Sequence, residues 1–343
     1  MIKQTDIIKK IEASGLLGRG GAGYPVAKKW RQVKESLTGK KAGYIVVNGA
    51  EGEPGVKKDG HILGLYPELV LKGVKLALSY LSPTRVKRVY FVLSKEYHNR
   101  YSQGLKQCLA KPEFKGLSEK LEFVVKPSHP SYICGEETAL LNLIEGQRLQ
   151  ARLKPPYPTK SGLFGQPTLV NNVETFYDVS LAVAGKYRQL RFYTISGAAR
   201  HPGVYQLPID SEIESILRTT DNYPSFPFFV QVGGEASGEI LNAGQLDQPA
   251  SGAGSIMVYD LKRTDKRKLL RRWFSFYAQE SCGQCTICRE GSYRLLEMAD
   301  SSHFDQKLME EIADVLADSS LCALGASLPI PLRSYYENVL KNN

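Results

Sequence analysis

The cysteine pattern near the C-terminus is the strongest constraint on how this chain of 343 residues can fold. The segment ESCGQCTICREG, residues 280–291, contains a CxxCxxC triplet, and a fourth cysteine follows in SLCALG. The four residues are Cys282, Cys285, Cys288 and Cys322. Three thiolates from one turn and a fourth from elsewhere match the ligand set of one [4Fe-4S] cluster. The pattern therefore predicts an electron-transfer protein.

A zinc site is the competing interpretation, because four cysteines also bind zinc tetrahedrally. Structural zinc sites usually pair a CxxC with a second CxxC or with histidines, so the spacing favours the cluster. A disulfide framework fits less well, because the chain has six cysteines in 343 residues and no secretory apolar region in MIKQTDIIKK. We expect the remaining cysteines, Cys108 and Cys134, to be plain thiols.

Composition sets the broad class of the protein. Hydrophobic residues make up 42% of the chain and charged residues 23%, as in soluble globular proteins, and no apolar stretch is long enough for a bilayer. The net charge of +10 includes a basic run at 262–272, which indicates a partner surface or a solvated face rather than a nucleic-acid site. We therefore expect a cytoplasmic protein without nucleic acid or direct membrane insertion, attached to any membrane only through partner subunits.

Alternating hydrophobic segments predict the domain organisation. Residues 1–188 alternate strands, such as 44–50 and 88–94, with helices, which indicates a mainly parallel sheet covered by helices on both faces. Residues 189–260 are rich in short strands around one helical stretch, which suggests a small β-grasp domain. Residues 261–343 have helical patterns around the cysteines, so we expect a helical bundle that holds the cluster.

A glycine-rich loop, GRGGAG, precedes the first clear strand. Gly18, Gly20 and Gly23 have the GxGxxG spacing, and such loops can bring backbone N–H groups against a phosphate. The position before the strand argues against an ordinary dinucleotide-binding fingerprint. Lys28 and Lys29 follow about one turn into the predicted helix, where each is either a phosphate contact or a solvated surface charge.

Two acidic segments are candidates for ligand contacts. NGAEGEPG follows a predicted strand and carries Asn48, Glu51 and Glu53, at the end of the strand where parallel sheets bind ligands. The two glutamates are candidates for hydrogen bonds to a ribose or to a ring. In CGEET, Glu136 and Glu137 open a helix, where acidic residues also serve simply to stabilise the N-terminus.

A fourth segment, residues 154–175, is too irregular to serve only as core. It carries Lys154, Tyr157, Asn171 and Asn172.

Taken together, five segments in order resemble the flavin-carrying NADH-binding subunit of respiratory complex I and the related flavin subunits of NAD-linked hydrogenases and formate dehydrogenases. The segments are GRGGAGYP, NGAEGEPG, YICGEETALL, RLKPPYP with NNVET, and ESCGQCTICREG. The resemblance covers nearly the whole chain. It implies a Rossmann-like FMN domain (1–188), a ubiquitin-like β-grasp domain (189–260) and a C-terminal helical bundle with the cluster (261–343).

The resemblance also implies residue roles. FMN would be contacted by Gly18, Gly20, Lys29, Asn48, Gly135, Glu136, Asn171 and Asn172. The nicotinamide nucleotide site would be lined by Glu53, Glu137, Lys154, Tyr157 and Tyr24, with Glu137 and Glu53 as the catalytic pair. The implied chemistry is hydride transfer from NADH to FMN, after which single electrons leave through the cluster. The implied partners are a thioredoxin-like [2Fe-2S] subunit and a further iron–sulfur subunit of a redox complex.

Two departures from the family motifs keep an alternative open. The family usually has an aspartate where this chain has Ala50, and often an aromatic residue where this chain has Gln32. These differences motivate an FMN and [4Fe-4S] subunit with another nucleotide or with reversed electron flow. A non-catalytic scaffold or nucleic-acid binder with zinc at the cysteines is a third interpretation, based on the basic composition.

Overall fold

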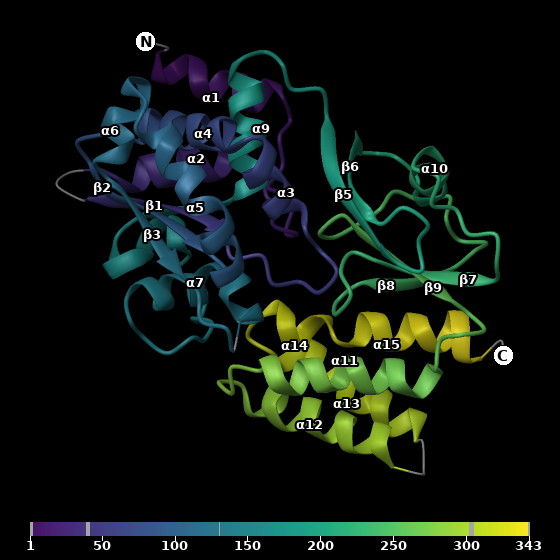
Figure 1. The fold of residues 1–343 in the computed structure, drawn as a ribbon. Coiled ribbons are helices and arrows are strands. Elements are labelled where there is room, and N and C mark those ends of the chain that lie inside the picture. Colours follow the sequence, from purple (N-terminus) through teal and green to yellow (C-terminus); the bar gives the residue numbers. More distant parts are fainter. Residues whose placement is uncertain (1–2, 39–41, 130, 302–304, 342–343) are drawn as a thin grey trace. The chain divides into compact units, whose positions relative to one another are not determined.

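The computed structural model describes residues 3–38, 42–129, 131–301 and 305–341. The chain forms two compact units (Figure 1). The first unit combines residues 1–51 with 57–189, and the second combines residues 52–56 with 190–343. The short segment 52–56 therefore belongs to the second unit although it lies in the N-terminal half of the sequence. Our predicted division into three domains stays a prediction.

The first unit is built on a parallel four-stranded sheet in the order β3-β2-β1-β4. Its strands are β1 (Gly43–Gly49), β2 (Val86–Leu93), β3 (Leu121–Val125) and β4 (Thr168–Asn172). The main helices are α1 (Gln4–Ala13), α2 (Val26–Ser36), α3 (Lys58–Leu65), α4 (Pro67–Leu81), α5 (Lys95–Leu109), α7 (Glu137–Ile144) and α9 (Val173–Val183). Shorter turns are η1 (Pro112–Phe114), α6 (Lys115–Ser118), η2 (Tyr132–Gly135), α8 (Pro158–Ser161) and η3 (Leu163–Gly165).

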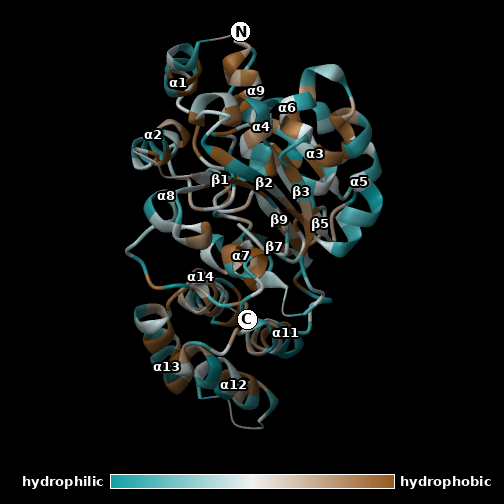
Figure 2. Cartoon of the chain, turned by 90° about the vertical axis from the view of Figure 1, so that its left-hand side faces the viewer, coloured by the Kyte–Doolittle hydropathy of each residue, from teal (hydrophilic) through white to brown (hydrophobic). Residues whose placement is uncertain are grey.

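Both faces of this sheet are covered, which explains why β1 is buried along nearly its whole length. Tyr44 and Val46 pack with Leu140 and Leu141 of α7 in one hydrophobic cluster. Figure 1 shows α4 and α9 on the opposite side of the sheet, and both helices contact β1. Outer helices are amphipathic: α5 is mostly hydrophilic in Figure 2 and buries only Leu105 and Leu109.

The second unit begins with a mixed five-stranded sheet in the order β6-β5-β9-β7-β8. The strands are β5 (Leu190–Gly197), β6 (Gly203–Pro208), β7 (Phe228–Val232), β8 (Glu239–Asn242) and β9 (Ser255–Asp260). β9 runs parallel to β5, whereas the other neighbouring pairs are antiparallel. Helix α10 (Ile213–Thr219) packs on one face, where Ile213, Ile216 and Leu217 join the core of the sheet.

The opposite face of this second sheet contacts the C-terminal helices through aromatic side chains. Phe229 stacks on Tyr259 with ring centroids 4.9 Å apart, and Tyr335 lies 5.8 Å from Phe229 and 5.2 Å from Trp273. The helices are α11 (Lys266–Glu280), α12 (Thr286–Asp300), α13 (Gln306–Ser319), α14 (Ala323–Ser327) and α15 (Pro329–Tyr335), followed by the π-helical turn η4 (Tyr336–Leu340). Consecutive helices α11, α12 and α13 contact one another.

The structure agrees with most predicted elements and adds several. The strands predicted at 44–50 and 88–94 correspond to β1 and β2. The sequence did not predict helix α1, strand β8, strand β4 or helix α9, although β4 is one of the two partners of β1 in the sheet. Among the described residues, the helices are all too short or too polar to span a bilayer.

Candidate functional site

The carboxyl ends of β1 and β4 form the centre of the candidate site in the first unit. Asn48 and Asn172 are paired in register at these strand ends. Asn48 Nδ2 donates to the Gly135 carbonyl at 3.1 Å, and Asn172 Nδ2 donates to the Asn48 carbonyl at 3.3 Å. Asn172 also caps α9, because its Oδ1 accepts from Glu174 N at 2.9 Å. Three predicted site residues are therefore joined directly.

The glycine-rich loop closes on itself next to this edge. Gly18 N donates to the Tyr24 carbonyl at 2.9 Å, so the intervening residues form the tip of the loop. Gly21 and Gly23 have positive φ angles of 101° and 62°, which favour glycine. A Cβ on Gly20 would lie 3.6 Å from the Cβ of Asn172, so the loop tip lies beside the end of β4.

Arg19 anchors this loop from below. It is buried, its Nε donates to Asp178 Oδ2 at 2.9 Å, and its Nη2 donates to the Tyr187 hydroxyl at 2.6 Å. Its backbone N–H donates to Thr175 Oγ1 at 2.9 Å. Because Asp178 and Thr175 belong to α9, the arginine fixes the loop to the helix that follows β4. The sequence alone did not predict this role.

Glu137 lies between two lysines. Lys29 Nζ is 3.1 Å from Glu137 Oε2, and Lys154 Nζ is 3.7 Å from Glu137 Oε1. Glu136 instead caps α7, with its Oε2 accepting from Thr138 N and Ala139 N at 2.8 Å each. Although burial opposes the charged form, the hydrogen bond that Lys154 donates to Glu136 and the charges of both glutamates raise the pKa of Lys154. This half-buried, charged arrangement offers both donors and acceptors to a polar ligand.

The remaining predicted residues of the first unit lie around the same loops. Tyr24 is 36% exposed and its hydroxyl donates to Gln32 Oε1 at 3.2 Å, while the Nζ of Lys28 lies 5.7 Å from the centroid of its ring. Tyr157, at the start of α8, is 54% exposed. Lys28 therefore has an aromatic contact. The exposure of both tyrosine rings fits surfaces on which a planar ligand can stack.

Asn171 provides a local test of whether a ligand fits. It is 6% exposed, and in the described part of the chain its buried Oδ1 has no hydrogen-bond partner. A buried acceptor normally has a donor, so this atom fits a ligand hydroxyl or N–H group. FMN, whose ribityl chain carries hydroxyl groups, is suited to that position.

A cluster of buried charged side chains contacts Asn172 of the candidate site. Lys58 Nζ is 2.7 Å from Asp59 Oδ1, 3.1 Å from Glu174 Oε2 and 3.1 Å from Asn172 Oδ1. Glu51 accepts from the backbone N–H of Asp59 at 3.1 Å.

The hydroxyl of Tyr97 donates to the second oxygen of Glu51 at 2.6 Å. Burial, together with the charge of Asp59, raises the pKa of Glu51 to about 7. In the same region, burial and the charge of Glu174 raise the pKa of Asp178 to about 7 despite Arg19. The predicted contact of Glu51 with a ribose or a ring stays a prediction, and each of its oxygens also accepts from a protein donor.

The raised pKa of Glu51 predicts a pH-dependent stability. The ordinary pKa of a glutamate is 4.5. Between pH 4.5 and about 7, Glu51 loses its proton in the unfolded chain but keeps it in the folded chain, so the free energy of unfolding falls as the pH rises. Glu51→Gln is expected to reduce the loss of stability between about pH 5 and pH 7.5 by on the order of 1–2 kcal/mol. Urea unfolding of the full chain at the two pH values measures this difference.

Glu12→Gln is the control, because the hydrogen bond from Arg31 lowers the pKa of Glu12 and no change in slope is expected in that window. An identical pH slope in Glu51→Gln and the unchanged chain would contradict the effect.

Glu53, the other predicted catalytic residue, belongs to the second unit. Its Oε1 accepts from Ala236 N at 2.9 Å, in the loop after β7. Gly234 allows this approach, since a Cβ there would lie 2.3 Å from Glu53 Oε1. The Ala236 carbonyl accepts from the buried Tyr277 hydroxyl at 2.7 Å, and that hydroxyl is 3.3 Å from Ser327 Oγ. Hydrogen bonds therefore connect Glu53 to α11 and to the end of α14.

The predicted iron ligands lie in two segments that contact each other. Cys285 Sγ accepts from the backbone N–H of Leu321 at 3.3 Å, next to Cys322. A Cβ on Gly325 would lie 3.2 Å from Cys288 Sγ, so α14 approaches the triplet closely. Within the described residues, no three acidic, histidine or cysteine side chains are already arranged as a metal site.

The chemistry of these donors fits an iron–sulfur cluster. Burial raises the pKa of the Cys288 thiol, and the neighbouring Cys285 and Cys282 add to this rise. Iron binds the thiolate, so the positive charge of the metal is what stabilises that form against the raised pKa of Cys288.

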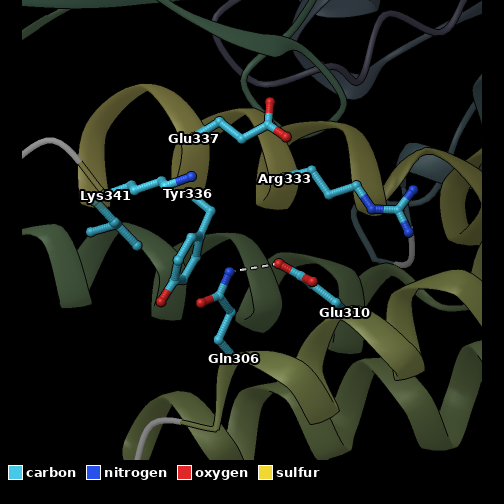
Figure 3. A pocket seen from close by; sticks show the side chains of 7 residues that line it. Gln306, Glu310, Arg333, Tyr336, Glu337 and Lys341 are labelled. Atoms are coloured by element: carbon cyan, nitrogen blue, oxygen red, sulfur yellow. Dashed lines mark hydrogen bonds between the residues drawn. The ribbon is translucent and has the colours of Figure 1, made fainter.

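A separate cavity of about 600 Å³ lies among the C-terminal helices (Figure 3). It is lined by Gln306, Glu310, Arg333, Tyr336, Glu337, Leu340 and Lys341. Gln306 Nε2 donates to Glu310 Oε1 at 2.7 Å, and Arg333 is paired with Asp314. None of the predicted site residues lines it, so it is distinct from the candidate site.

Comparisons with known proteins agree with this geometry. The Nuo51 FMN-binding domain matches residues 11–181, and the NADH-ubiquinone oxidoreductase-F iron-sulfur binding region matches residues 268–340. The first match covers the glycine loop and the carboxyl ends of β1 and β4, and the second covers the four cysteines. Fold and site together thus define a flavoprotein subunit with an iron–sulfur region.

Individual relatives agree over most of the chain. The NADH-quinone oxidoreductase-F protein of Mycobacterium tuberculosis is 33% identical, over 96% of this chain and 82% of the relative. Flavoprotein 1 of the mitochondrial NADH dehydrogenase [ubiquinone] from Dictyostelium discoideum is 31% identical, over 95% and 76%. The chain belongs to the NADH-quinone oxidoreductase-F family. The predicted resemblance is confirmed.

A solved structure extends the comparison to hydrogenases. The crystal structure of an NAD+-reducing [NiFe]-hydrogenase in the H2-reduced state matches 98% of this chain with a TM-score of 0.88 and 28% identity. This chain spans 62% of the hydrogenase chain that it matches.

Proposed function

We propose that this chain is the electron-input subunit of a multisubunit redox complex. In this proposal it accepts hydride from NADH on FMN and passes single electrons through a [4Fe-4S] cluster to partner iron–sulfur subunits. One observation supports the proposal most directly. The glycine loop, Asn48, Asn172 and Glu137 with its two lysines lie near the carboxyl ends of β1 and β4, within the region that matches the FMN-binding domain. The cysteine donor set in the second family region supports the cluster.

The protein's own residues would bind and orient the cofactor and the nucleotide. FMN supplies the conversion between two-electron and one-electron transfer. Lys29 and the N–H groups of the loop around Gly20 compensate anionic charge, and Asn171 offers its unpartnered oxygen to a donor. Glu137 and Lys154 present an acceptor and a donor to a nucleotide, and the exposed rings of Tyr24 and Tyr157 offer stacking surfaces.

The folds of the second unit and the partner subunits are part of the same proposal. In the second sheet, β9 lies between the antiparallel pairs β6–β5 and β7–β8 and runs parallel to β5. This order supports a β-grasp domain. The contacts among α11, α12 and α13 support a helical bundle around the cluster. We further propose a thioredoxin-like [2Fe-2S] subunit and another iron–sulfur subunit as partners, and a cytoplasmic location with membrane attachment only through them.

A second candidate function is a subunit in which electrons flow toward the nucleotide. The similarity to an NAD+-reducing hydrogenase favours this direction, and Ala50 and Gln32 leave the identity of the nucleotide open. In both candidates the same residues bind the flavin.

Anaerobic stopped-flow mixing of the reconstituted chain with NADH or NADPH tests the proposal. We expect NADH to bleach the flavin absorbance at least about tenfold faster than NADPH at equal concentration. Faster bleaching by NADPH would mean that NADPH, rather than NADH, is the hydride donor. A chain that binds neither FMN nor iron after reconstitution would contradict it altogether.

A further inference from the structure

Lys126 is a buried residue for which the proposed function has not yet supplied a role. It directly follows β3, and its backbone N–H donates to the Leu93 carbonyl at 2.9 Å, which extends the pairing of β3 with β2. Its side chain is 5% exposed. A lysine is rarely buried to this extent unless its polar end is fully engaged.

The end of the Lys126 side chain has three acceptors. Nζ donates to the carbonyls of Ala50 at 3.1 Å, Glu51 at 3.1 Å and Ser131 at 3.2 Å. A neutral amine has only two N–H groups, whereas the ammonium has three. The three acceptors therefore fit the charged form, which places a positive charge inside the carboxyl edge of the sheet.

The segments that Lys126 joins are the ones that would hold the flavin. Ala50 and Glu51 follow β1 in the NGAEGEPG segment. Ser131 directly precedes η2, which leads to Gly135 and to the cap of α7. The hydrogen bond from Asn48 to Gly135 joins the same two segments at the surface. Lys126 thus ties them together from the buried side.

We propose that Lys126 is a positioning residue of the flavin site. Its ammonium fixes the two segments at the required separation and adds a positive charge that stabilises the negatively charged reduced flavin relative to the oxidised form. Removal of the ammonium would leave three carbonyls without their donor and remove that charge. This inference depends on the proposed binding of FMN to the first unit.

The test compares Lys126→Met with Lys126→Arg and with a matched control in the full chain. Lys120 is the control, because its Nζ also donates to a backbone carbonyl, that of Val86 at 2.8 Å, but at the amino edge of the same sheet. FMN affinity is measured by fluorescence titration, and the flavin midpoint potential by spectroelectrochemistry. We expect Lys126→Met to weaken FMN binding by about tenfold, which corresponds to about 1.4 kcal/mol, and to make the potential more negative.

The other variants sharpen the test. Lys126→Arg keeps the positive charge, so its flavin potential is expected to stay closer to that of the unchanged chain than the potential of Lys126→Met does, and Lys120→Met is expected to leave affinity and potential unchanged. Lys126→Gln keeps two N–H donors without the charge, and it replaces Lys126→Met if that variant does not fold. Its potential is expected to shift in the same negative direction.

Equal affinity and potential in the Lys126 and Lys120 variants would overturn the positioning role. Failure of the unchanged chain to bind FMN would instead overturn the proposed function, so the two outcomes are distinguishable.

Discussion

Replacing Cys322 by alanine is expected to abolish the proposed four-iron cluster. Cys322 lies directly before α14, and the neighbouring Leu321 N–H donates to Cys285 Sγ, so it is the donor brought to the triplet from elsewhere in the chain. With only three thiolates left, the fourth iron has no protein ligand. We expect the iron content to fall below about four atoms per chain and the four-iron signal in electron paramagnetic resonance to be lost.

Cys108→Ala is the matched control for this variant, because Cys108 lies on α5 in the first unit. It should keep the full iron content and the same signal. Unchanged iron and an intact four-iron signal in Cys322→Ala would show that the ligand assignment is wrong. Zinc in place of iron in the unchanged chain would favour the zinc interpretation of the same cysteines.

Replacing Glu137 by glutamine is expected to lower the turnover of NADH by about two orders of magnitude while FMN remains bound. Glu137 is partly exposed and faces Lys29 and Lys154, so the substitution removes the charge that these lysines balance and changes the contacts offered to the nucleotide. An orienting or acid–base group typically contributes about 10²–10⁴-fold to a rate. Steady-state turnover and the flavin content of the purified variant measure the two quantities separately.

Glu145→Gln is the control for Glu137, because Glu145 is also paired with a cation, Arg152 at 2.8 Å, but at the other end of α7. Its turnover should stay close to that of the unchanged chain. Loss of FMN from Glu137→Gln, followed by normal turnover after reconstitution, would assign Glu137 to flavin binding instead.

Local sequence patterns predicted the elements that carry their own signals. Strand β1, which carries Asn48 and ends at Gly49, has a continuous run of apolar residues, and the helix that begins at Glu137 has a clear period. Strand β4 was missed because its short apolar run lies among glycines, prolines and polar residues. Its place beside β1 depends on pairing across more than a hundred residues, which no local pattern reports.

The candidate site was predicted only where residue types cluster along the sequence. Gly20, Asn48 and Asn172 were predicted in this way, and the structure places them near one another at the carboxyl ends of β1 and β4. Arg19 and Lys126 were missed because a single cation near a loop is usually solvated. Their roles depend on partners far along the chain, such as Asp178 for Arg19.

The assignment of residues 52–56 to the second unit limits how this protein can be divided for experiments. A fragment that ends near residue 189 would retain Glu53 but lack Ala236 and Ser237, to which its carboxylate is hydrogen-bonded. A fragment that begins near residue 190 would keep a loop with two adjacent glycines, Gly233 and Gly234, and lack the glutamate that fills it. Neither half expressed alone would therefore reproduce the surroundings of Glu53, whereas co-expressed halves that reassemble could restore them.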